Sequence, residues 1–538
     1  MGDSRRVINR PPLRIPIPGR VLSIRPLLVS PSLHHPLSSS HPSSGIGPQL
    51  VQVTPKHAMR VTIPNPLGPP VTVDTDRYNN LSHLFSALPL PAGFRSSRRA
   101  PLRLLLALFA FVIIVTWAPA PPFPPSYAAE WARERSSSRL FTDARVPEGR
   151  DGRYVKFDSP RATGINHQLQ RVLLQHHLAI LGNRSLAFDP IVQDHTIFPF
   201  RLTLPPWRSS VIPLSAFIAT VVSGFERFYD TPRAVPASQF RKVCPPYKQH
   251  VMTLKNELQP HGDVELVGDG QSRVHQLQVL LAASQDRCVR IQGTVFDDAF
   301  FDSHAPLQMY DSFARSPVLA QFSFSPAVLA IVNRAMPDLA PDALRYDLDR
   351  AAVAVSSEPR QTGMMWKHVL ALHLRQGEGW EELCEEKGRL SAPFVSFNKL
   401  PKLPGNENVP PPPDMVEATR MGLYSAKCNP PVLDIIARAR RMHKNHPQLK
   451  VVYIMTDGPA EWVDEVRRWL LSDGWEKVWV GRSDLYPAWS DHELGVAVDM
   501  EVARRAGVFV GNGFSTTSSN VVLLRSRDGV HPDLTQFW

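Results

Sequence analysis

The sequence predicts an α/β fold made of two Rossmann-like lobes. Beyond residue 150, strand-like and helix-like segments alternate, which favours parallel sheets covered by helices. The alternation restarts at a strand near residue 369, so we expect an N-terminal lobe at 151–365 and a C-terminal lobe at 366–538. Near the end of the chain, a buried strand at 508–510 passes through a glycine turn into a hydroxyl-rich helix start. Such an element is common in doubly wound sheets.

Residues 1–100 are predicted to form a disordered tail. They are rich in Pro, Ser and Arg and show no sustained periodicity, so they cannot bury enough apolar surface to order themselves. They carry most of the net charge of +11, and the rest of the chain is nearly neutral. A nucleic-acid-binding protein needs its basic patch on the folded domain, so we expect no nucleic-acid partner.

The apolar segment at 101–119 predicts a transmembrane signal anchor. Its run after Arg103 is about 15 residues, roughly 22 Å of helix, and Trp117 can sit at the membrane interface. Basic residues precede the segment, so the positive-inside rule places the tail in the cytosol and the body in the lumen. We expect a single-pass type II protein of the endoplasmic reticulum or Golgi membrane, with a stem at 120–150. A buried core helix is the alternative.

The N-terminal lobe should open with an amphipathic helix that starts at Ile165, where apolar residues recur at helical spacing. Asn166 lies at the helix start, near any ligand above the sheet. Gly182 is a plausible stop signal. The tripeptide Asn183-Arg184-Ser185 follows it and is a glycosylation sequon, so Asn183 is a candidate glycan site in a lumenal body.

The C-terminal lobe should open with a strand at 369–375 that carries His373 and Arg375 on one face at its carboxyl end. Gly377 and Gly379 let the chain turn at once. Ligands of open α/β sheets bind at this edge, so Arg375 is placed to recognise a phosphate. Apolar patterning predicts further helices over 432–443 and 461–471 and strands over 289–291, 451–455 and 478–480.

The glycine turn at 511–513 leads into a helix whose first residues are Ser515, Thr516 and Thr517. A helix N-terminus presents free backbone N–H groups and the positive end of the helix dipole, and the hydroxyls can donate to a phosphate. The sequence therefore predicts an anion site here, although an ordinary capped helix would read the same way.

Taken in this order, these segments resemble the GDP-fucose protein O-fucosyltransferase family. The similar motifs are a G-x-N-x-Q-like start at 164–168, His373-Leu374-Arg375, a strand that ends in Thr456-Asp457, the pair Asp499 and Glu501, and the segment at 509–519. The resemblance spans roughly residues 155 to 538. It implies a GT-B architecture, in which two lobes face a cleft, and an inverting, metal-independent transfer of fucose from GDP-fucose to a hydroxyl of Ser or Thr on a protein.

The resemblance also implies roles for individual residues. Arg375 would stabilise the β-phosphate during transfer and is the predicted catalytic residue. His373 and Asp457 would hold the nucleoside, and Asn166 would lie close to donor and acceptor. The remaining predicted donor-binding residues belong to the late turn and helix start: Asn512, Ser515, Thr516 and Thr517.

The chain departs from the family pattern at three positions. Gln376 replaces a second arginine, Glu378 replaces an aspartate, and Thr163 stands where some relatives carry a glutamate suspected of acting as the base. Asp158 is the nearest alternative base in sequence. Two other functions stay open: a fucosyltransferase for a glycan acceptor, and a catalytically weakened lumenal binding protein.

We expect neither a metal nor a cofactor. Of the two Asp-x-Asp pairs, Asp74 and Asp76 fall in the tail, and Asp347 and Asp349 fall in an Ala-rich helical pattern. The four cysteines lack C-x-x-C spacing, which argues against zinc. They permit two disulfides in a lumenal body, with three possible pairings.

Overall fold

The fold is known from a computed structural model. The chain divides into two units, residues 1–110 and residues 111–538. The described residues are 60–63, 71–74, 105–110, 127–137, 149, 151–158, 164–193, 208–219, 232–255, 261–340, 366–404, 410–486 and 491–538. In the first unit, strands β1 (Arg60–Ile63) and β2 (Val71–Asp74) pair antiparallel. The rest of the predicted tail lies outside the described residues, and its disorder stays a prediction.

Of the predicted membrane segment at 101–119, the structure describes only residues 105–110, which are helical. The remainder of that segment lies outside the described residues. Within the described ranges, no helix combines the length and the apolar character needed to cross a bilayer.

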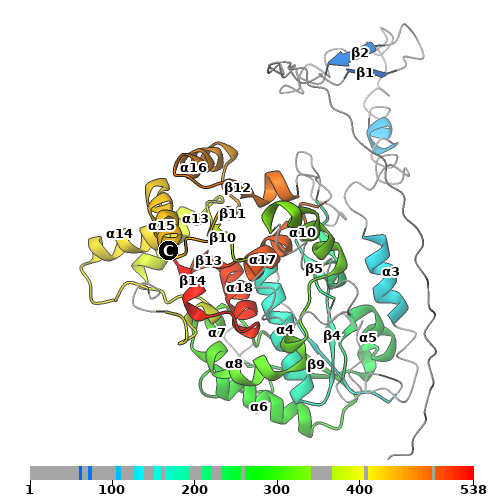
Figure 1. The fold of residues 1–538 in the computed structure, drawn as a ribbon. Helices are drawn as coiled ribbons and strands as arrows, with labels where there is room; N and C mark the ends of the chain where they lie inside the picture. Colours follow the sequence, from blue (N-terminus) through cyan, green and yellow to red (C-terminus); the bar gives the residue numbers. More distant parts are fainter. Residues whose placement is uncertain are drawn as a thin grey trace, which may run out of the picture. The chain divides into compact units, whose positions relative to one another are not determined.

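The N-terminal lobe is built on a five-stranded sheet in the order β7-β4-β3-β9-β8, in which all neighbouring strands are parallel (Figure 1). The strands are β3 (Tyr154–Phe157), β4 (Ser185–Phe188), β7 (Val235–Pro236), β8 (His250–Thr253) and β9 (Cys288–Gln292). The α-helices are α4 (Ile165–Leu181), α5 (Ala237–Val243), α6 (Gly270–Ala283), α7 (Asp298–Asp302), α8 (Ala305–Arg315), α9 (Pro317–Ala320) and α10 (Pro326–Leu339). A separate antiparallel pair joins β5 (Ile191–Val192) to β6 (Val211–Ile212), and short 3-10 turns lie at η4 (Leu214–Ala216) and η5 (Pro246–Lys248).

Helix α4 forms because its apolar residues recur at helical spacing and are buried, as Leu169 and Leu173 show. The helix ends at Gly182, as predicted. A Cβ at position 182 would lie only 2.8 Å from the Cβ of Leu281 on α6, so the close approach of the two helices requires glycine.

The C-terminal lobe is built on a second parallel sheet in the order β12-β11-β10-β13-β14. Its strands are β10 (Val369–Leu374), β11 (Val451–Thr456), β12 (Lys477–Val480), β13 (Val508–Gly511) and β14 (Thr535–Phe537). Its helices are α13 (Trp380–Arg389), η6 (Ser396–Lys399), α14 (Glu417–Cys428), α15 (Val432–Asn445), α16 (Ala460–Ser472), η8 (Gly481–Leu485), α17 (Gly495–Arg505), α18 (Thr516–Arg527) and η9 (Pro532–Leu534).

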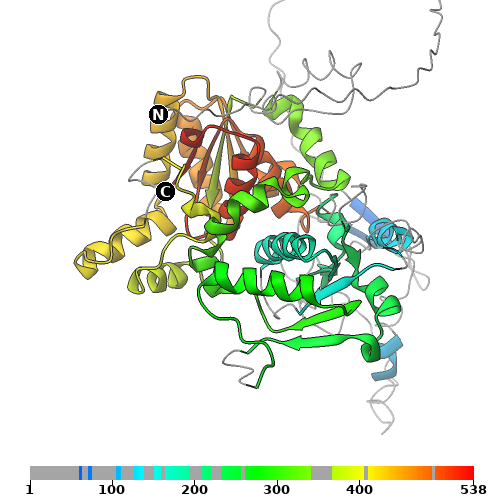
Figure 2. The same cartoon turned by 90° about the horizontal axis from the view of Figure 1, so that it is seen from below.

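Helices cover both faces of this second sheet (Figure 2). Leu370 and Leu372 of β10 pack with residues of α15 and α16 on one face. Ala371 belongs to the core that contains α17 and α18 on the other face. Because both faces are covered, the strands are apolar at nearly every position. The prediction of an α/β fold with parallel sheets is confirmed.

Helix α3 (Ala128–Ser137) lies in the segment expected to be a stem, yet it packs against the N-terminal lobe. Its Glu134 is buried, and the Glu134 carboxylate accepts a hydrogen bond of 3.1 Å from the backbone N–H of Ser215. Just before the helix, the Tyr127 hydroxyl donates to Glu493 of the C-terminal lobe at 2.8 Å. Part of the expected stem therefore belongs to the folded body.

Each lobe contains one disulfide. Cys244 is bonded to Cys288 in the N-terminal lobe, and Cys384 is bonded to Cys428 in the C-terminal lobe. This is one of the three pairings that the sequence left open. The second bond joins α13 to the end of α14 and so fixes the segment that follows β10.

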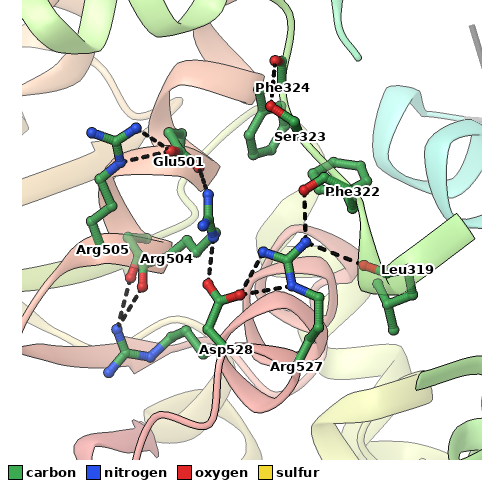
Figure 3. Close-up of polar contacts among 11 residues, drawn as sticks. Leu319, Phe322, Ser323, Phe324, Glu501, Arg504, Arg505, Arg527 and Asp528 are labelled. Carbon is green, nitrogen blue, oxygen red and sulfur yellow. Dashed lines mark hydrogen bonds and ion pairs between the residues drawn. The ribbon is translucent and has the colours of Figure 1, made fainter. Parts of the chain in front are cut away.

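A buried network of charges lies where the end of α18 meets the N-terminal lobe (Figure 3). Asp528 accepts hydrogen bonds from Arg504 at 2.5 Å and from Arg527 at 2.7 Å, and Glu501 binds Arg504 and Arg505 at 2.6 Å. The Arg527 guanidinium also donates to backbone carbonyls of the N-terminal lobe, those of Phe322 at 2.7 Å and of Leu319 at 3.2 Å. The network therefore connects the two lobes.

Candidate active site

A cavity of about 860 Å³ lies between the two lobes, at the carboxyl ends of β10 and β11. The starts of α4 and α7 form its wall on the N-terminal lobe, and α13 and the start of α18 contribute from the C-terminal lobe. Seven of the residues singled out from the sequence line it: Asn166, His373, Arg375, Asp457, Ser515, Thr516 and Thr517. Arg375 and the 515–517 helix start therefore share one cavity, as the anion-site hypothesis requires.

Arg375 follows β10 directly and points along the cavity wall. Its guanidinium carbon lies 4.6 Å from the centroid of the Trp380 ring, and its Nε lies 3.6 Å from Oδ2 of Asp457. Nε is buried but has no hydrogen-bond partner among the described residues. The side chain is 41% exposed, so a bound anion can reach the guanidinium.

Asp457, at the end of β11, holds the loop that follows β10. Its Oδ1 accepts the backbone N–H groups of Gln376 at 2.9 Å and Gly377 at 3.0 Å. A Cβ at Gly377 would lie 2.4 Å from Asp457 Oδ2, so only glycine lets the loop approach this closely. One Asp457 oxygen is therefore committed to positioning the loop that carries Arg375, a role that the sequence did not suggest.

His373 is buried at the end of β10, and its Nδ1 lies 2.8 Å from the Ser518 hydroxyl. Burial, assisted by the nearby charge of Arg375 and opposed by Asp457, lowers the pKa of His373 to about 4. The imidazole is therefore uncharged at neutral pH. It can donate one hydrogen bond and accept another without adding positive charge to the cavity.

The start of α18 connects the anion site to the N-terminal lobe. Ser515 is the N-cap and accepts the backbone N–H of Thr517 at 3.3 Å. The Thr517 hydroxyl accepts a hydrogen bond of 2.5 Å from the Asn166 amide of α4. One turn further on, the Gln170 amide donates to Ser519 at 3.1 Å. Two helix starts from different lobes thus converge on the same end of the cavity.

Asn512 does not line the cavity. It is fully buried, its amide donates to the carbonyl of Cys428 at 2.6 Å, and its Oδ1 accepts the backbone N–H of Phe514 at 3.0 Å. Both ends of the side chain therefore hold the glycine turn in place, and the expected contact of Asn512 with the donor stays a prediction. Asp158, the suggested base, also lies outside the lining and pairs with Arg290 at 2.9 Å.

The other described positions singled out from the sequence are not among the residues that line the cavity. Asn183 is exposed in the turn between α4 and β4 at a positive φ of 51°, and Ser185 of its sequon is buried. Gln376 bonds to Asn429, and Glu378 is exposed on the surface. Thr163, Asp76, Asp347 and Asp349 lie outside the described residues.

Several lining residues were given no role from the sequence, and Asp499 was named there only as part of the family resemblance. Asp499 is buried on α17 and accepts hydrogen bonds from the hydroxyls of Tyr453 at 2.6 Å and Tyr486 at 3.0 Å. Burial raises the pKa of Asp499 to about 7, although both hydroxyls oppose the shift. Trp380 also lines the cavity, and nothing in the sequence pattern showed that its ring would stack on Arg375. Across the described ranges, no group of three or more His, Cys, Asp or Glu side chains could hold a metal ion.

No protein-family model matches the sequence, and no curated protein matches it. Among solved structures, the chain is similar to POFUT1 in complex with GDP-fucose, with a TM-score of 0.44 and 16% identity over 72% of this chain and 98% of that chain. The apo form of POFUT1 gives 0.43 and 15% over 72% and 98%. A mutant of FUT1 from Arabidopsis thaliana in complex with GDP gives 0.31 and 10% over 78% and 82%. At TM-scores this low, we draw nothing from these likenesses about the site.

Proposed function

We propose that this chain is an inverting GT-B fucosyltransferase, which transfers fucose from GDP-fucose to a hydroxyl acceptor, Ser or Thr of a protein. The observation that carries the proposal is the shared cavity of Arg375 and the α18 start. Each of the sequence motifs that resemble the O-fucosyltransferase family contributes at least one side chain to that cavity.

The cavity offers what the reaction needs without a divalent ion. As the bond from the sugar to the phosphate breaks, negative charge develops on the departing diphosphate. The Arg375 guanidinium can bind two phosphate oxygens, and Trp380 restricts its orientation by stacking. The N-terminus of α18 adds the backbone N–H groups and the helix dipole behind Ser515, Thr516 and Thr517.

The neutral His373 and the loop held by Asp457 keep this arrangement in place. His373 binds the Ser518 hydroxyl at 2.8 Å, and that hydroxyl also accepts the backbone N–H of Asn512 at 2.8 Å. The strand end that carries Arg375 is thereby tied to the turn before α18. The two anion-binding elements are held together before any donor arrives, so little reorganisation is required during transfer.

The test measures transfer by the purified full-length chain from radiolabelled GDP-fucose, with and without EDTA, across protein and glycan acceptors. We expect transfer that EDTA does not reduce, and a loss of about 10²- to 10³-fold in kcat for Arg375→Ala. Arg389→Ala, an exposed arginine of α13 outside the cavity, is the matched control and should retain the wild-type rate. Undiminished transfer by Arg375→Ala, or no transfer from GDP-fucose to any acceptor, would refute the proposal.

A further inference from the structure

We propose that His167 is the general base that takes the proton from the acceptor hydroxyl, and that Asp298 stabilises the imidazolium that forms. This inference rests on the proposed function, because it assigns a missing role in the same reaction. Neither residue was singled out for a role from the sequence.

His167 and Asp298 both line the cavity from the N-terminal lobe. His167 lies in the first turn of α4, next to Asn166, whose amide binds Thr517 of α18. Its Nε2 is 3.9 Å from Oδ1 of Asp298 in α7. The imidazole also packs against the Phe301 ring, with 5.8 Å between ring centroids, which restricts its orientation.

The imidazole is available to accept a proton. In the part of the chain that the structure describes, neither nitrogen of His167 makes a hydrogen bond, and the side chain is 28% exposed. The Asp298 side chain is 77% exposed, so an acceptor can approach both groups from the cavity.

The other carboxylates of the cavity are already engaged. Asp457 accepts two backbone N–H groups, and Asp499 accepts two tyrosine hydroxyls. Glu493 accepts the Tyr127 hydroxyl and the backbone N–H of Ser209. Asp302 lies 3.7 Å from the Lys387 ammonium group. Apart from Asp298 itself, each described carboxylate that lines the cavity has a partner that competes with the role of base.

The charges that face His167 set its protonation. Burial lowers the pKa of His167 below its usual value, and Arg171 of α4 and Arg375 of β10's end lower it further. Asp298 and Asp302 of α7 act in the opposite direction. The ring is therefore neutral at physiological pH, the state that a base requires.

The proposed step conserves atoms and charge. The acceptor O–H bond breaks and its proton passes to Nε2 of His167, while the oxygen lone pair forms the new bond to the anomeric carbon of fucose. The bond from that carbon to the β-phosphate oxygen breaks, and its electron pair leaves with GDP. The imidazolium then lies 3.9 Å from the Asp298 carboxylate and later returns its proton to solvent.

The test uses full-length His167→Gln and Asp298→Asn, with His275→Gln, an exposed histidine of α6, as the matched control. We expect His167→Gln to lower kcat for transfer by about 10²- to 10⁴-fold while the Kd for GDP stays at the wild-type value. The Asp298→Asn variant should lose part of its kcat, though less than His167→Gln, because the carboxylate that stabilises the imidazolium is gone. The acidic limb of its pH–rate profile should move to lower pH, because the same carboxylate raises the pKa of His167. The control should match the wild type.

The outcomes separate the two proposals. Absence of transfer by the wild-type chain would overturn the proposed function and the base assignment with it. Active wild type together with an unchanged kcat for His167→Gln would overturn the base assignment alone. Because Asp298 is exposed, Asp298→Asn should fold normally. If the acidic limb of its pH–rate profile did not move, that result would count against His167 as the base even if His167→Gln were unstable.

Discussion

Replacing Asp528 by Asn should destabilise the folded body through the network in Figure 3. Asp528 is 6% exposed and is the common acceptor for Arg504 and Arg527. Without the Asp528 charge, two buried guanidinium groups lose the carboxylate that they share. Arg504 would still be paired with Glu501, and Arg527 would still donate to two backbone carbonyls. Breaking one partner of a buried ion pair typically costs about 3–5 kcal/mol.

The assay is urea unfolding of the full-length chain, followed by tryptophan fluorescence. Asp533→Asn provides the matched control. Asp533 lies five residues further on and is 65% exposed, and its only ion pair with a described residue is the one with His531 at 3.5 Å. An exposed pair contributes less than about 1 kcal/mol, so the control should leave the free energy of unfolding nearly unchanged. If the two variants lose equal stability, the network does not hold the lobes together as argued.

Two further predictions concern the cavity. Trp380→Leu should lower kcat/KM for transfer about 2- to 30-fold, because it removes the cation–π contact with Arg375. Trp380→Phe should lower kcat/KM less. Trp469 is an exposed tryptophan, so the control Trp469→Leu should leave kcat/KM unchanged. Asp499 keeps its proton in the folded state up to a pKa of about 7, whereas the unfolded chain releases it near 3.8, so wild-type stability should fall as pH rises between these values. The Asn side chain of Asp499→Asn cannot ionise. The free energy of unfolding of this variant minus that of the wild type, measured in urea, should therefore increase by about 2–4 kcal/mol from pH 4 to pH 8. A difference that does not change with pH would contradict the pKa assigned to Asp499.

The buried strands and amphipathic helices were predictable from the sequence. The strand expected at 451–455 is β11 (Val451–Thr456), and the helix expected at 432–443 is α15 (Val432–Asn445). Strands buried on both faces must be apolar throughout, and a helix on one face must repeat its apolar residues every three or four positions. These constraints act locally, so a single sequence displays them.

The contacts of polar residues were harder to predict. Asn512 and Ser515 stand three positions apart in one motif, yet one holds a turn and the other faces the cavity. A polar side chain beside a glycine turn suits either role, and only the neighbouring elements decide. The disulfide partners were open for the same reason, since pairing depends on which helices pack together. The placement of His167 opposite Asp298 depends on how α4 and α7 meet, and nothing in the local pattern encodes it.

The first two turns of α18 belong to both lobes at once, since Thr517, Ser519 and Asn520 are all bonded to α4. A hinge opening that swung the lobes apart would break these bonds and separate the helix start from α4, whereas the Ser515 cap and the link from His373 to Ser518 would stay in the C-terminal lobe. If the chain is the proposed transferase, substrates and products should pass through the cavity's rim as long as these bonds to α4 are kept.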